Sequence, residues 1–173
     1  MTILLQDGDL LLRELEETDL PLLVRYANNK KVSINLRDAF PNPYTFQDAR
    51  NFLNLVKRQE NGMIFAIEYQ GVYTGNTGLV PGTDVYRKSA EIGYFIGEPF
   101  WNKGITTKAV TLLTEFGFRD MDFVRIHAGV FAYNKASQRV LEKCGYHLEG
   151  VFRNAVIKNG VMCDEMRYAK IKE

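Results

Sequence analysis

The sequence predicts an α/β fold of the α+β type, in which helices flank a mixed central sheet. The chain has 173 residues and a hydrophobic content of 46%, which suits one compact domain, 1–173, with a sizeable core. Hydrophobic periods and turn signals give the order strand, two helices, three strands, helix, strand, helix and two strands. This order is neither a strict alternation nor a complete segregation of helices and strands, so we expect a sheet of mixed strand direction.

The first half of the chain reads as a strand, two capped helices and a hairpin. Thr18 or Asp19 can cap the first helix, and Thr45 with Asp48 forms a variant of the capping box at the second. Two prolines interrupt any helix in the stretch between them. In order we expect a strand at 9–14, a helix at 18–28, an irregular stretch at 30–43, a helix after Thr45, and a hairpin with strands at 63–69 and 72–80.

The second half alternates strands with helices and closes on two strands. A glycine after the second of these helices marks its end, and the triplet Lys158-Asn159-Gly160 is a turn signal between the last strands. In order we expect a strand at 89–96, a helix at 105–121, a strand at 124–130, a helix at 134–144, and strands at 146–151 and 161–171.

The charge balance and hydropathy limit which classes of partner the protein can have. Lys and Arg total 22 against 21 Asp and Glu, a net charge of +1. A nucleic-acid-binding domain usually carries a clear basic excess, so no nucleic acid partner is expected. No window approaches the ~20 apolar residues of a membrane helix, and the N-terminus lacks the pattern of a signal peptide. We therefore expect a soluble, cytoplasmic protein without a membrane partner.

The cysteines and histidines show no pattern of a metal or redox site. Cys144 and Cys163 are far apart in sequence, without metal-type spacing, and His127 and His147 are the only histidines. A buried free cysteine behaves as a small hydrophobe, so both cysteines are expected to be reduced packing residues. A histidine could meet a cysteine in space, although nothing in the sequence requires it. No metal is expected.

The segment EPFWNKGITTKAV, at 98–110, has the features of an anion site. The first amides of a helix have no acceptor within it, and the helix dipole adds partial positive charge there. Gly104 would let the backbone approach an anion closely, and Lys103 would add a full charge. A pyrophosphate would fit, although such a glycine can also serve only the turn. The glycine spacing matches neither the NAD-type fingerprint nor the P-loop.

A second segment, FAYNKASQRVLEKCGY at 131–146, also joins a strand to a helix. Asn134 can cap this helix, and its amide could instead contact a ligand lying between two strands. The first reading is purely structural and the second functional, and the segment by itself leaves both open.

Together these segments carry a family resemblance. AEIGYFIGEPFWNKGITTKAV, IHAGVFAYNKASQRVLEKCGYHLEG and NGVMCDEMRYA resemble the GNAT acetyltransferase superfamily. PYTFQDARNFL is similar to the second helix of its ribosomal-protein N-terminal alanine acetyltransferase branch, and the resemblance covers about 9–170. It implies a mostly antiparallel sheet whose fourth and fifth strands, 89–96 and 124–130 here, splay apart and hold acetyl-CoA between them.

The resemblance also implies a set of cofactor contacts. The backbone of Phe95, Ile96 and Gly97 would bind the pantetheine arm, and Asn134 would contact it from the other side. The pyrophosphate would lie on the segment Asn102, Lys103, Gly104, Ile105, Thr106 and Thr107. Trp101 is usual for this branch. Thr106 is less usual, and we leave its effect on cofactor affinity open. Arg139 could reach a phosphate, the acceptor or only solvent.

Attack on a thioester requires a neutral amine. An α-amine has a pKa of ~7.7–8.0 and a lysine amine ~10.4, so an N-terminal acceptor needs only modest help from a general base. Glu91 is the candidate base by resemblance, with a solvated strand carboxylate as the alternative. Many members of the superfamily have a tyrosine acid where this chain has Leu141, and the resemblance to the branch implies Ser137 as the candidate acid instead. Tyr94 and Tyr133 are spare candidates that we expect to serve packing.

The sequence thus predicts an acetyl-CoA-dependent N-acetyltransferase that acts by direct attack of a primary amine. A protein N-terminal α-amine is the first acceptor class. Segments 36–44 and 154–163 would form the acceptor site, and they carry no cluster of acids that would suit a polyamine. Polyamines, amino acids and antibiotics remain alternatives, as do a non-catalytic acyl-CoA sensor and an interaction protein with an empty cleft. The protein could be a monomer or a homodimer.

Overall fold

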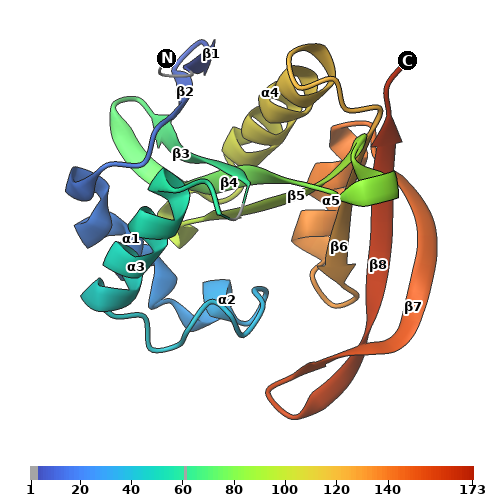
Figure 1. Ribbon diagram of the computed structural model, residues 1–173. Coiled ribbons are helices and arrows are strands. Elements are labelled where there is room, and N and C mark those ends of the chain that lie inside the picture. Colours follow the sequence, from blue (N-terminus) through green and yellow to red (C-terminus); the bar gives the residue numbers. More distant parts are fainter. Residues whose placement is uncertain (1–3, 61) are drawn as a thin grey trace.

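A computed structural model describes residues 4–60 and 62–173. One eight-stranded sheet runs through it in the order β1-β2-β3-β4-β5-β6-β8-β7 (Figure 1). Every neighbouring pair is antiparallel except β5 and β6, which are parallel. The strands are β1 (Leu5–Asp7), β2 (Leu10–Arg13), β3 (Met63–Tyr69), β4 (Val72–Pro81), β5 (Ser89–Ile96), β6 (Arg125–Phe131), β7 (His147–Lys158) and β8 (Val161–Ile171). The predicted mixed and mostly antiparallel sheet is confirmed.

Helices cover both faces of this sheet. The α-helices are α1 (Leu20–Ala27), α2 (Lys30–Ser33), α3 (Phe46–Lys57), α4 (Ile105–Arg119) and α5 (Lys135–Lys143). Figure 1 shows α4 on one side of β3, β4 and β5, and α1 and α3 on the other. The predicted capping box is present at α3, where the Thr45 side chain accepts a hydrogen bond from the Asp48 amide and the Asp48 carboxylate accepts one from the Thr45 amide.

Two apolar clusters fix the helices to the sheet. On one face, α4 buries residues such as Leu113 against Leu79, Ile92 and Ile126. On the other face, α1 and α3 pack around Phe95 of β5. Each fully buried Leu or Ile contributes about 1.5–3 kcal/mol relative to an exposed one. Strand β5 is therefore held from both sides, so its position is well determined.

Three local features differ from the sequence prediction. Strand β1 was missed, because only three residues pair with β2. The stretch expected to be irregular contains α2, a single turn whose first residue follows the N-cap Asn29. Strand β7 extends to Lys158, well beyond 151, because two register shifts let it stay paired with β8. None of the helices in the described residues has the length and apolar content needed to cross a membrane.

Candidate active site

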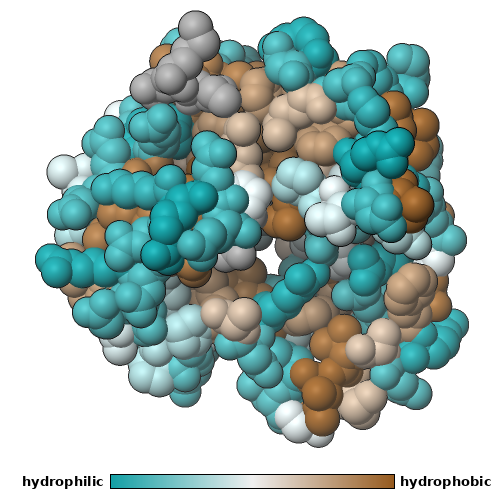
Figure 2. Space-filling model, in the orientation of Figure 1, coloured by the Kyte–Doolittle hydropathy of each residue, from teal (hydrophilic) through white to brown (hydrophobic). Residues whose placement is uncertain are grey.

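Strands β5 and β6 pair at one end only. Ser89, Ala90 and Glu91 pair with the first three residues of β6, and beyond this point the two strands separate. Strand β5 continues beside β4 and β6 beside β8. The predicted splay of the strands at 89–96 and 124–130 is confirmed. A cleft of about 860 Å³ lies at the split, and Figure 2 shows the surface hollowed between the helices and the β7–β8 hairpin.

The N-terminus of α4 opens onto this cleft. Gly104 adopts a left-handed conformation with φ 74° and has no side chain to cap the helix. The first amide bonded within the turn is that of Lys108, which donates to the Gly104 carbonyl at 3.1 Å. The preceding amides of Ile105, Thr106 and Thr107 lie at the cleft wall, where they can bind an anion.

The segment before α4 is fixed by three contacts. The Trp101 indole Nε1 donates to the Ile96 carbonyl at 2.9 Å, and the Gly97 amide donates to the Thr74 carbonyl at 2.8 Å. The Lys103 ammonium lies 5.7 Å from the centre of the Phe100 ring. Gly97 and Lys103 are not among the residues that line the cleft. The sequence-predicted residues that line it are Glu91, Phe95, Ile96, Asn102, Gly104, Ile105, Thr106, Thr107, Asn134 and Ser137.

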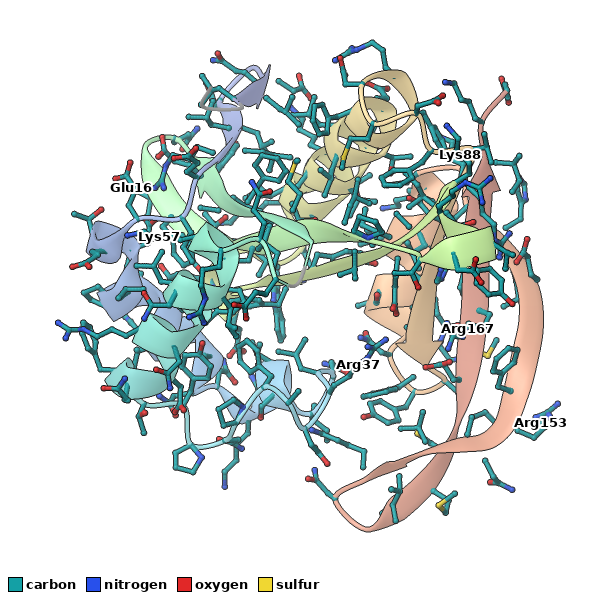
Figure 3. The ribbon with its side chains drawn as sticks, viewed as in Figure 1. Glu16, Arg37, Lys57, Lys88, Arg153 and Arg167 are labelled. Atoms are coloured by element: carbon teal, nitrogen blue, oxygen red, sulfur yellow. The ribbon has the colours of Figure 1, made fainter. Side chains whose placement is uncertain are left out.

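Glu91 lies where the two strands part, and its side chain is 29% exposed. It forms an ion pair with Arg37, which comes from the segment after α2. Figure 3 shows Arg37 extending from that segment toward the centre of the molecule. Glu91 is thus a positioned carboxylate at the cleft rather than a freely solvated strand residue.

Ser137 and Tyr94 meet on the opposite side of β5. The Tyr94 hydroxyl and the Ser137 Oγ are 2.8 Å apart, and either can be the donor. Burial holds the pKa of the Tyr94 phenol well above its ordinary value, so this hydroxyl keeps its proton at neutral pH. The Asn134 Oδ1 accepts a hydrogen bond from the Ser137 amide at 3.1 Å, so Asn134 caps α5 and also lines the cleft. Leu141 is fully buried in the core.

Two segments that are distant in sequence meet in the fold. The Lys158 ammonium pairs with the Asp38 carboxylate at 2.7 Å, which joins the turn of the β7–β8 hairpin to the segment after α2. The Tyr133 hydroxyl donates to the Ile34 carbonyl of the same segment. The stretches 36–44 and 154–163 are therefore neighbours, as the acceptor-site hypothesis requires.

Three residues at this site were missed or assigned another role. Tyr94 was expected to serve packing, although its alternation on β5 placed it opposite Glu91. Arg37 and Glu165 both line the cleft, and the sequence did not single them out. The only available signal for Glu165 was an acid within an otherwise mixed strand, two residues before Arg167.

The cysteines lie outside the cleft. Cys144 is buried between α5 and α4, where its Sγ lies 3.4 Å from both the Thr107 carbonyl and the Thr111 hydroxyl. Burial raises the pKa of this thiol, so it remains protonated. Cys163 is half-buried on β8. Both positions fit the expected packing role.

His127 pairs with Glu91 across the parallel strands, and it gives a pH prediction. Burial lowers the pKa of His127 below its ordinary value; the charges of Arg125 and Arg167 lower it further, and those of Glu91 and Glu149 partly offset this. The unfolded chain then binds a proton more readily than the folded one. We expect the free energy of unfolding to fall as the pH drops below about 6.5, and to level off below the folded pKa.

Urea titrations at several pH values measure this effect. His127→Asn should lose less stability than the parent chain between about pH 7.5 and pH 5, because it has no imidazole to protonate. Equal losses in both proteins would show that His127 titrates alike in the folded and unfolded states.

The chain matches known acetyltransferases. Residues 9–147 match the family model described as an acetyltransferase (GNAT) domain. The probable N-acetyltransferase YjcK of Bacillus subtilis is 40% identical over 101 residues, which cover 54% of this chain and 56% of YjcK. That match therefore spans about half the length of YjcK.

Relatives with named acceptors differ from one another. The putative ribosomal N-acetyltransferase YdaF of Bacillus subtilis is 33% identical over 112 residues, covering 65% of this chain and 61% of YdaF. Spermidine N(1)-acetyltransferase of Escherichia coli is 27% identical over 150 residues, covering 86% of this chain and 78% of that protein.

A solved structure agrees with the fold. The microcin C7 self-immunity acetyltransferase MccE, in complex with acetyl-CoA and AMP, superposes with a TM-score of 0.83 at 26% identity. The match covers 96% of this chain and 94% of MccE. The family resemblance read from the motifs is confirmed, and the chain belongs to the GNAT acetyltransferase family.

Proposed function

We propose that residues 1–173 act as one acetyl-CoA-dependent N-acetyltransferase domain that acetylates a protein N-terminal α-amine. The observation that carries this proposal is the cleft at the split of β5 and β6, because its wall holds a glycine-opened helix N-terminus, a paired carboxylate and a hydroxyl pair. A cytoplasmic location follows from the sequence expectation, and a monomer and a homodimer are both compatible with the proposal.

The walls of the cleft fit acetyl-CoA, which supplies an activated thioester when bound. The amides of Ile105, Thr106 and Thr107 would bind the pyrophosphate, with the positive end of the α4 dipole behind them. The hydroxyls of the two threonines can add hydrogen bonds. The backbone of Phe95 and Ile96 lies along the cleft and would hold the pantetheine arm.

Glu91 would accept the proton of the attacking amine, directly or through a water molecule. The N–C bond forms and the C–S bond breaks in one direct transfer, without a covalent enzyme intermediate. Arg37 holds the carboxylate at the split of the strands. The Phe95 or Ile96 backbone would supply the N–H that stabilises the carbonyl oxygen as it gains charge.

Ser137 would hydrogen-bond the departing thiolate and pass it a proton. A serine hydroxyl is a weak acid by itself. Its contact with the Tyr94 phenol at 2.8 Å provides a second hydroxyl, through which the proton can be replaced. This pair takes the place of the single tyrosine that is absent at Leu141.

The acceptor side favours a peptide N-terminus over a polyamine. Its two cleft-lining carboxylates, Glu91 and Glu165, each have an arginine partner, so this side has no excess negative charge. A polycation would need such an excess. A peptide carries one reacting amine and neutral amides, which this balance suits.

Thermal melts with acetyl-CoA, NADH and ATP test the cofactor. A ligand at about 100 times its Kd stabilises the folded state by about 2.7 kcal/mol. We expect acetyl-CoA to raise Tm by about 5–10 °C for a domain of this size, and the two controls to leave it unchanged. No shift with saturating acetyl-CoA would refute the enzyme proposal, and a shift without acetylation of any amine would favour an acyl-CoA sensor.

A further inference from the structure

A second carboxylate faces the cleft from strand β8. Glu165 is only 8% exposed and lines the cleft, although it belongs to neither of the strands that separate. It pairs with Phe131 of β6 on one side and with Phe152 of β7 on the other. A buried carboxylate is costly unless it is paired, so its place beside a cleft calls for a partner.

Glu165 and Glu91 lie on the same face of the sheet. Glu91 pairs with His127, and His127 pairs with Ala169, so these three side chains share one face. Glu165 is four residues before Ala169 on β8, and alternate residues of a strand point to the same side. Both carboxylates therefore face the side on which Arg37 closes the cleft.

Glycine at position 129 makes room for the carboxylate. A Cβ atom built on Gly129 would lie 2.8 Å from the Glu165 Oε2 and 2.9 Å from its Cδ. No side chain could therefore occupy position 129 while Glu165 keeps this conformation. The sheet is built so that the Glu165 carboxylate lies directly over the β6 backbone.

The ion pair with Arg167 leaves part of the hydrogen-bonding capacity of Glu165 unused. The Arg167 Nε lies 2.6 Å from the Glu165 Oε1, yet among the described residues this buried nitrogen forms no aligned hydrogen bond. The Arg167 guanidinium also lies 5.1 Å from the Phe152 ring centre. An ionised carboxylate has about four acceptor sites, so Glu165 can still accept hydrogen bonds from a molecule in the cleft. Figure 3 shows Arg167 on β8, to the right of Arg37, which lies near the centre of the molecule.

We infer that Glu165 determines acceptor specificity by binding a second N–H donor of the acceptor, a few atoms from the reacting amine. This inference rests on the proposed function. In a peptide the donor is the next backbone amide, and in a diamine it is the second ammonium. A simple monoamine has no such group. Gly129 makes the carboxylate position available, and Arg167 holds the carboxylate there.

Three acceptors test whether a second N–H donor is bound and which kind it is. They are a short peptide amide with a free N-terminus, 1,4-diaminobutane and n-butylamine. Glu165→Gln should lower kcat/KM for acceptors with a second donor by about 10–100-fold, since a hydrogen bond to a charged group is lost. The loss should appear mainly in KM. The kcat/KM for n-butylamine should change by less than about twofold, because this monoamine has no second N–H donor and so does not make the contact that the substitution removes.

Gly129→Ala provides an independent variant that keeps the acid. Its methyl group would displace the carboxylate, so the same selective loss should follow. Glu149→Gln is the matched control, because Glu149 of β7 forms an ion pair with Arg125 of β6 and does not line the cleft. Melts with acetyl-CoA should give the same Tm shift in all variants, which shows that the cofactor site is intact.

Isothermal titration calorimetry of each acceptor with the CoA-loaded protein measures binding at this subsite in the absence of turnover. Weaker binding of the peptide or the diamine to Glu165→Gln supports the inference even if the parent chain acetylates neither. An equal loss for n-butylamine would overturn it, since Glu165 would then serve the chemistry or the fold. Unchanged binding of all three acceptors, or no binding to the parent chain, would also overturn it.

Discussion

Replacing Glu91 with glutamine should lower kcat by about 10²–10⁴-fold, which is the usual contribution of a general base. The substitution keeps the shape of the side chain and removes its capacity to accept the amine proton. Glu91 lies where β5 and β6 separate, lines the cleft and is held by Arg37. The acetyl-CoA-dependent Tm shift should be unchanged, because the segments proposed to bind the cofactor lie elsewhere on the wall of the cleft. Steady-state assays over a range of pH measure the loss.

Two further results would distinguish base catalysis from structural support. At high pH an α-amine is already neutral, so the deficit of Glu91→Gln should shrink above about pH 8. Glu149→Gln, which changes a strand carboxylate outside the cleft, should retain full activity. If Glu91→Gln kept the parent kcat at neutral pH, another group or water would take the proton, and Glu91 would serve only its ion pair with Arg37.

Local signals predicted most of the fold. The boundaries of β5 and the cap of α3 follow from alternation and from a capping box, which depend on neighbouring residues. Strand β1 and the extension of β7 depend on long-range pairing instead. Leu5–Asp7 is too short to show a period, and β7 reaches Lys158 only because bulges absorb its extra residues.

The features of the candidate site also fall into those that local sequence signals predict and those that depend on long-range contacts. A glycine before a helix is a local signal, so the left-handed turn at Gly104, the proposed anion site, could be read from the sequence. Pairs that join distant segments could not. Arg37 reaches Glu91 across 54 positions, and Tyr94 reaches Ser137 across 43. The fold alone brings such residues together, and no period or motif records their contact. The position of Glu165 could not be read from the sequence either, since its proposed role depends on the absence of a side chain at Gly129.

Replacing Gly75 with alanine should damage both stability and cofactor binding. A Cβ atom on Gly75 of β4 would lie 2.1 Å from the Phe95 carbonyl oxygen and 2.8 Å from the Ile96 Cα. Both contacts are to backbone, so no rotamer change relieves them. Overpacking of this kind costs about 1–3 kcal/mol, and we expect the upper end, with a fall in Tm of about 6–12 °C. Because β5 must shift, the Kd for acetyl-CoA should rise about tenfold or more.

The substitution at Gly75 alters the spacing of β4 and β5, so a glycine on another strand provides the control. At Gly150 of β7 the added methyl would meet only the Phe152 ring, at 3.7 Å, and Gly150→Ala should stay within about 0.5 kcal/mol of the parent. If Gly75→Ala does not fold, Trp101→Phe tests the cofactor half separately, since it removes the indole donor that holds the Ile96 carbonyl at 2.9 Å. Parent-like stability and affinity in Gly75→Ala would mean that β4 does not set the position of Phe95 and Ile96. The α1 and α3 cluster around Phe95 would then be the element that places the cofactor strand.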